Sequence, residues 1–75
     1  MDKENILLGH TYECQPVGLQ RRVIGEAVKK LENCLVLSLE HYDMVDHEEV
    51  EDRFGKVVVK YSEVYGKTMA DSFFR

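Results

Sequence analysis

The sequence has few of the features that mark a secreted or membrane-spanning protein. Its 75 residues include only two cysteines, Cys14 and Cys34, too few for a disulfide scaffold. The first nine residues, MDKENILLG, hold three consecutive large apolar residues, fewer than a signal peptide needs. No apolar run approaches the roughly 20 residues that cross a bilayer. These absences predict a soluble, cytoplasmic protein with free thiols.

Motifs for metal binding and catalysis are also missing. The zinc-ligand types present are Cys14, Cys34, His10, His41 and His47. They form no C-x-x-C pair, and the two histidines separated by five residues have no cysteine knuckle beside them. The acidic stretch lacks the glycine and the alternate-residue spacing of a calcium loop, and no glycine motif would cradle a phosphate. We therefore expect no cofactor, no metal site, no evident small-molecule substrate and no catalysis.

Charge is distributed unevenly along the chain. The net charge is −4, and residues 40–52 contain seven carboxylates with no lysine or arginine. Four of the ten basic residues lie close together, namely Arg21, Arg22, Lys29 and Lys30. This uneven charge distribution favours an oriented electrostatic encounter with a partner. The negative net charge argues against a protein dedicated to binding duplex DNA.

Residues 23–41 contain the longest apolar run and a polar corner at Glu32-Asn33. After the corner, Leu35, Leu37 and Leu39 share one face of a strand, because side chains alternate between the two faces of a sheet. Asn at the corner tolerates the left-handed conformation that tight hairpins need. The pattern predicts two antiparallel strands that form the central hairpin of the fold.

A helix over the same stretch is the alternative to this hairpin. Val23, Ala27, Leu31 and Leu35 recur every four residues, but Gly25 would then lie inside the helix at a cost of about 1 kcal/mol. Two hairpin registers also remain open. A two-residue loop places Glu26 opposite Leu39. A three-residue loop places Ala27 opposite Leu37 and Gly25 opposite Leu39, and we favour it because small residues then face leucines.

A short helix is expected at about residues 46–54. Asp46 can cap it, with Glu49 as the reciprocal partner and Val45 and Val50 as a hydrophobic staple. Glu49 and Arg53 can form an ion pair, Val50 and Phe54 an apolar pair, and Gly55 ends the helix. A helix this short is only marginally stable by itself in water. We therefore expect Val50 and Phe54 to dock on the sheet.

Three further strands complete the predicted fold. They are expected at residues 10–15, with Tyr12 and Cys14 on one face, at 56–61, with Val57 and Val59 on one face, and at 67–70 after a turn over 62–66. Pro16 to Gln20 reads as a loop, and Phe73 and Phe74 either cover an open end or form an exposed tail. We predict one domain over residues 1–75, a mainly β, small, five-stranded, partly open SH3-like barrel with one short helix.

The order of Leu8-Gly9, a loop at Gly18, and then GEAVKKLENCLVL from Gly25 to Leu37 resembles a known pattern. It is similar to the small uncharacterised YkvS-like proteins of Gram-positive bacteria, which in turn resemble KOW-type, SH3-like barrels. The valine-rich stretch 57–61 is similar to that family's later strand, and the likeness covers about residues 8–64. Residues 43–54 are more acidic than the pattern, and the tail after Gly66 has no counterpart. The family supplies no activity to carry over.

Two binding functions are compatible with these features. A protein-interaction module, binding a protein partner or a second copy, would use Val28, Val36 and Val58 if they line the outer sheet face instead of lying under the helix. The alternative is a KOW-like RNA-binding or ribosome-associated domain. The residues for such nucleic-acid or partner contact are Arg21, Arg22, Lys29 and Lys30, with Tyr12 and Tyr61 for stacking. We favour the protein partner.

Overall fold

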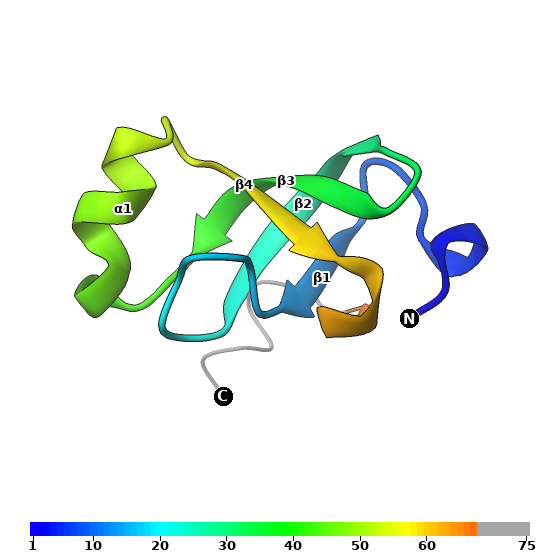
Figure 1. Cartoon of the computed structure of the whole chain (residues 1–75), viewed down its shortest axis with the longest axis horizontal. Helices are drawn as coiled ribbons and strands as arrows, with labels where there is room; N and C mark the ends of the chain where they lie inside the picture. Colours follow the sequence, from blue (N-terminus) through cyan, green and yellow to red (C-terminus); the bar gives the residue numbers. More distant parts are fainter. Residues whose placement is uncertain (68–75) are drawn as a thin grey trace.

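The computed structural model describes residues 1–67 and shows a mainly β fold with one short α-helix (Figure 1). The strands are β1 (Thr11–Cys14), β2 (Val23–Lys30), β3 (Cys34–His41), β4 (Lys56–Lys60) and β5 (Val64–Lys67), and the helix is α1 (His47–Asp52). The five strands form one antiparallel sheet in the order β4-β3-β2-β1-β5, which is not closed into a barrel. The predicted five strands, one short helix and partly open arrangement are confirmed.

Away from the turn, the β2–β3 hairpin has the register that the small residues predict. Gly25 pairs with Leu39 and Ala27 with Leu37. A β-carbon at Gly25 would lie 3.0 Å from the Ser38 carbonyl oxygen and 3.2 Å from the Leu37 Cβ, so the partner strand packs too closely for a larger residue.

The register shifts between Ala27 and Lys29, which leaves Val28 as the extra residue of a β-bulge. At the turn, Lys30 pairs with Leu35 and the Leu31 N–H donates to the Cys34 carbonyl oxygen, so the favoured three-residue loop is wrong there and the loop has two residues.

Alternating side chains build the core on one side of the sheet. On β3 and β4 the inward residues are Leu35, Leu37, Val57 and Val59, all at most 2% exposed. Tyr12 and Cys14 of β1 lie in the same cluster, as predicted. One apolar cluster joins these residues to six more buried ones, Ile6, Leu19, Val23, Ala27, Val50 and Val64.

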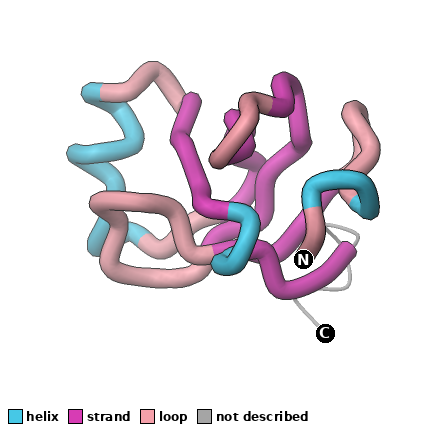
Figure 2. Tube along the Cα trace, turned by 45° about the vertical axis from the view of Figure 1, so that its right-hand side comes forward, coloured by secondary structure: helices cyan, strands magenta, loops and turns pink. Residues whose placement is uncertain are grey.

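The loop between β1 and β2, residues 15–22, crosses from the sheet to the helical end of the molecule (Figure 2). The Val17 N–H donates to the Val58 carbonyl oxygen at 3.0 Å, on the edge strand β4. Arg53 Nη1 donates to the Val17 carbonyl oxygen at 2.8 Å. The loop therefore covers part of the β4 edge and links it to the helix.

The start of the helical segment differs from the prediction. A 3₁₀ turn at Met44–Asp46 precedes α1, and the Asp43 side chain caps this turn by accepting from the Val45 N–H at 2.9 Å. Asp46 makes no side-chain cap. Its buried carboxylate instead accepts from the backbone N–H groups of Gln20 and Arg21. The predicted Asp46 cap is wrong because a partner from the β1–β2 loop takes both carboxylate oxygens.

The end of the helix confirms one predicted pair and corrects another. Glu49 and Arg53 form an ion pair of 3.1 Å, and Val50 docks on the core. Phe54 does not dock, because its side chain is 89% exposed and its φ is +56°. The helix ends at Asp52, and Phe54 and Gly55 both have positive φ, so the chain turns sharply and carries the phenyl ring outward.

The last strand begins earlier than predicted. A 3₁₀ turn occupies Tyr61–Glu63, and β5 follows at once from Val64 to Lys67, where the sequence predicted a turn. Val64 is buried in the core and pairs with Cys14 of β1, which sets where β5 begins. The remaining predicted strand positions, 68–70, and the phenylalanines Phe73 and Phe74 lie outside the described residues.

Candidate functional site

The four predicted basic contact residues do not form one patch. Arg21 and Arg22 precede β2, whereas Lys29 and Lys30 end it. An eight-residue strand spans roughly 25 Å, so the two pairs lie at opposite ends of the hairpin arm. Lys30 is also engaged, since its Nζ donates to the Ile6 carbonyl oxygen at 2.8 Å. A phosphate backbone would meet two separate pairs of charges here.

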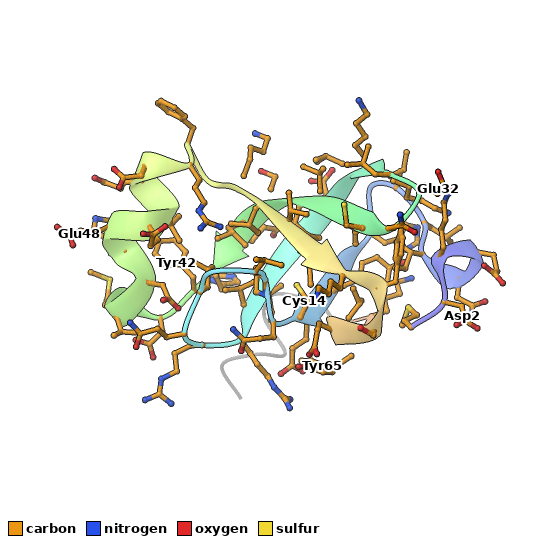
Figure 3. All side chains as sticks on the ribbon, in the orientation of Figure 1. Asp2, Cys14, Glu32, Tyr42, Glu48 and Tyr65 are labelled. Carbon is orange, nitrogen blue, oxygen red and sulfur yellow. The ribbon has the colours of Figure 1, made fainter. Side chains whose placement is uncertain are left out.

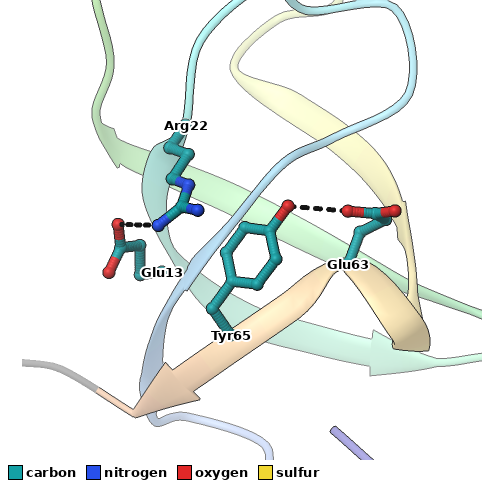
Figure 4. A network of polar contacts seen from close by, with 4 residues as sticks. All are labelled: Glu13, Arg22, Glu63 and Tyr65. Atoms are coloured by element: carbon teal, nitrogen blue, oxygen red, sulfur yellow. Dashed lines mark hydrogen bonds and ion pairs between the residues drawn. The ribbon is translucent and has the colours of Figure 1, made fainter.

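Arg22 belongs to a network that balances its charge (Figure 4). Its Nη1 lies 3.4 Å from Glu13 Oε2, and its guanidinium lies 4.2 Å from the centroid of the Tyr65 ring. The Tyr65 hydroxyl donates to Glu63 Oε2 at 2.6 Å, and this hydrogen bond raises the pKa of Tyr65. Two carboxylates thus accompany one guanidinium, which makes this corner a poor binding site for phosphate.

Neither tyrosine named for stacking presents a free ring. Tyr12 is 1% exposed, and its hydroxyl accepts from the Leu7 N–H at 2.8 Å. Tyr61 packs against the core, and its hydroxyl donates to the Leu31 carbonyl oxygen. Burial raises the pKa of Tyr61. Both side chains serve the fold, so the expectation that they stack on bases is corrected: a predicted strand face could not show that Tyr12 points into the core.

The outer side of β2, β3 and β4 carries a different set of residues. Val36 of β3 pairs with Val58 of β4, and on the other side both Val28 and Lys29 lie opposite Val36, because of the bulge. Val28 is 38% exposed and Val58 40% exposed. We call this surface the lysine–valine face, and it consists of Val28, Lys29, Val36, Lys56, Val58 and Lys60.

Lysines surround the valines on this face. Lys56 pairs with Ser38, and Lys60 pairs with Cys34, so these lysines stand on either side of Val58 on β4. All three lysines of the face are exposed. The face is therefore a short apolar strip with positive charge on its margins. Glu26 of β2 stands in the same row of the sheet as Lys56, because Ser38 pairs with both, so one corner of this side carries a carboxylate.

Sequence reasoning found the three valines but missed Lys56 and Lys60. The signal was present in Lys-Val-Val-Val-Lys at 56–60, since period-two alternation puts both lysines beside Val58. Which neighbours Val58 meets depends on the β3–β4 register. That register follows from a connection of fourteen residues that includes α1, too long for its geometry to be read from turn residues.

A pocket lies at the end of α1 next to Phe54. It has a volume of about 420 Å³ and is lined by Leu39, Tyr42, Val50, Glu51, Phe54 and Gly55. Figure 3 shows Tyr42 beside α1 and Glu48 on the outer side of that helix. His47 fixes the Tyr42 ring, because its Nδ1 shares a hydrogen bond of 3.0 Å with the Tyr42 hydroxyl and the two rings stack. His47 Nε2 lies 3.2 Å from Glu51 Oε1.

The thiols differ in their surroundings. Cys14 is fully buried, and burial, with a smaller effect of Glu13, raises its pKa to about 12. Such a thiol carries almost no thiolate at neutral pH, and the thiolate is the reactive form. Cys34 is partly exposed beside Lys60. Within residues 1–67, no three or more His, Cys, Asp or Glu side chains gather into a group that could hold a metal ion.

No family model matches the chain, and no curated protein or solved structure matches it. The resemblance to YkvS-like proteins thus stays a prediction that rests on the sequence pattern from Leu8 to Tyr61. None of the helices in the described part of the chain has the length and apolar character needed to cross a membrane.

Proposed function

We propose that this chain is a non-catalytic, cytoplasmic protein-interaction module that binds an acidic, partly apolar protein segment on the lysine–valine face. The observation that carries the proposal is the exposure of Val28 and Val58 on the outer side of the sheet. Apolar groups grouped on a surface and rimmed by charge are typical of protein-binding sites. The two unpaired cysteines support a reducing compartment.

The lysines at the margin of the face indicate that the partner carries acidic side chains. Lys29, Lys56 and Lys60 would meet carboxylates, which steer the encounter and fix its orientation. The valines would meet apolar side chains at the centre, where desolvation contributes most to affinity. Lysines hold their ammonium groups on flexible stems, so they can follow the carboxylates of a segment without a rigid geometry.

RNA is the less favoured partner. Recognition of single-stranded RNA uses exposed rings on which bases stack, and the lysine–valine face contains none. The predicted tyrosines are engaged in the fold, and the arginines lie beyond the other end of β2. These observations favour a protein segment over a nucleic acid.

Amide chemical shifts can test this function with two defined probes. One is a synthetic peptide of alternating glutamate and leucine, and the other is a single-stranded decauridine RNA. We expect the peptide to shift the amides of Val28, Val36 and Val58, with weaker binding at higher salt. A Val36→Thr/Val58→Thr variant keeps β-branched shapes at both positions and should lose most of the binding, whereas Arg21→Ala/Arg22→Ala should not. The proposal would be refuted if only the RNA changed the amide shifts of the protein, or if the peptide changed only amides outside the lysine–valine face.

A further inference from the structure

Phe54 is held in a conformation that a phenylalanine avoids. Its φ is +56°, and the left-handed region costs a residue with a β-carbon about 1–2 kcal/mol. Its ring is 89% exposed, so burial within the chain does not offset this cost. Strained residues that persist in a structure cluster at binding sites and other functional positions. The exposed ring therefore calls for a partner that covers it.

Phe54 lies between an apolar pocket, with Glu51 in its lining, and the acidic outer side of α1. The pocket beside it is lined by Leu39, Tyr42 and Val50. On α1, Glu48, Glu51 and Asp52 are exposed. We call this surface the Phe54 end, and it consists of Phe54, the pocket and these three carboxylates. It has the composition that we propose for the partner of the lysine–valine face.

The two surfaces adjoin in the chain. Lys56 opens β4 and stands two residues after Phe54, so the positive margin of one surface begins where the other surface ends. Two complementary surfaces of one chain can pair about a two-fold axis, so that each surface meets the other surface of the second copy. Pairing of like surfaces would instead set carboxylates against carboxylates.

We infer that the partner is a second copy of this chain, with the Phe54 end of each copy seated on the lysine–valine face of the other. This inference rests on the proposed function, since it names the occupant of the same face. In the dimer each phenyl ring covers the exposed valines Val28 and Val58 of the other copy. The carboxylates of α1 face Lys29, Lys56 and Lys60, which makes association weaker at higher salt.

Sedimentation equilibrium of paired variants tests this arrangement. Phe54→Asn removes the ring and suits a positive φ, and Val36→Thr/Val58→Thr removes the apolar strip but keeps β-branched residues. We expect the wild-type chain to dimerise and each variant to dimerise at least about tenfold more weakly. Mixed together, the two variants should form a 1:1 dimer, because the first retains an intact lysine–valine face and the second an intact Phe54 end.

A matched control and a contrary outcome complete the test. Leu8 is 55% exposed and lies outside both surfaces, so Leu8→Asn should dimerise like the wild type. Circular dichroism of each variant confirms that it is folded. A wild-type chain that stays monomeric at millimolar concentration, a dimer that survives Phe54→Asn, or a mixture that forms no 1:1 dimer would overturn the inference. If the monomer still binds the glutamate–leucine peptide, the proposed function stands without it.

Discussion

At the scale of single residues, the buried Asp46 joins the helical segment to the β1–β2 loop. Its carboxylate oxygens accept from the Gln20 N–H at 2.8 Å and from the Arg21 N–H at 3.0 Å. Asp46 is 2% exposed, so its carboxylate is shielded from water at both hydrogen bonds. A buried carboxylate is tolerated only where donors satisfy it, and these two amides do so.

Removing this carboxylate should destabilise the protein more than removing the helix cap. We expect Asp46→Ala to lower the free energy of unfolding by about 2–4 kcal/mol, because two N–H groups lose their acceptor. Asp43→Ala, which removes an exposed cap, should cost about 1 kcal/mol. Urea denaturation of both variants gives the comparison. Equal losses would contradict the assigned roles.

The two aspartates also show where residue-level prediction ends. Both precede a helical turn, and the capping rules suit either one. The choice between them depends on the loop residues Gln20 and Arg21, about 25 positions earlier in the chain, which come close only in the folded protein. Local sequence therefore located the helix but assigned its cap to the wrong aspartate.

At the scale of elements, the hairpin was the most predictable part of the fold. Matching of small residues with leucines gave the pairs Gly25–Leu39 and Ala27–Leu37, which the structure confirms. The bulge at Val28 was not predictable, because no local residue preference requires it. It matters for the candidate site, since it places both Val28 and Lys29 opposite Val36. The alternation on β4 was predicted, but the exposure of Val58 was not, because the helix could have covered that side.

The end of α1 should gain stability when Phe54 is replaced. Asparagine tolerates positive φ better than phenylalanine, and the wild-type ring is almost fully exposed. We expect Phe54→Asn to raise the free energy of unfolding by about 0.5–1 kcal/mol, provided that the chain is diluted until it is monomeric. Thermal unfolding at low concentration measures the change. A lower melting temperature would show that the ring stabilises the monomer.

At the scale of the whole molecule, one small core carries the stability. A chain of this length buries only about 60% of the surface that its unfolded form exposes, so individual core groups weigh heavily. Cys14 is one of them, with an ionisable thiol inside the apolar cluster. The alternation predicted that Cys14 shares a face with Tyr12, whereas the burial of that face depends on the strands on both sides of β1.

This thiol should make the stability fall at alkaline pH. The pKa of Cys14 is about 12 in the folded chain, against an ordinary value of 9.0. The unfolded chain therefore loses its proton first, and stability that is complete below pH 9 declines as the pH rises toward 12. Over these three units the loss reaches about 4 kcal/mol. Tyr61 and Tyr65, whose pKa values are also raised, contribute in the same range.

Comparison with Cys14→Ala isolates the thiol. The variant loses some packing at every pH but keeps both tyrosines, so the difference between the two unfolding free energies should shrink from pH 8 to pH 11. Urea denaturation at each pH supplies these free energies. A difference that stays constant over this range would show that Cys14 does not govern the alkaline loss.

The β1–β2 loop has a consequence for how the protein reaches its folded state. Four of its hydrogen-bond partners, Asp46, Arg53, Val58 and Glu63, lie more than twenty residues later in the chain. During synthesis the loop therefore waits for the second half of the polypeptide before it can order, although the hairpin that follows it can already form. Contacts of such long sequence separation slow the search for the native topology. The side of the core that this loop covers therefore stays open in the nascent chain until β4 has emerged.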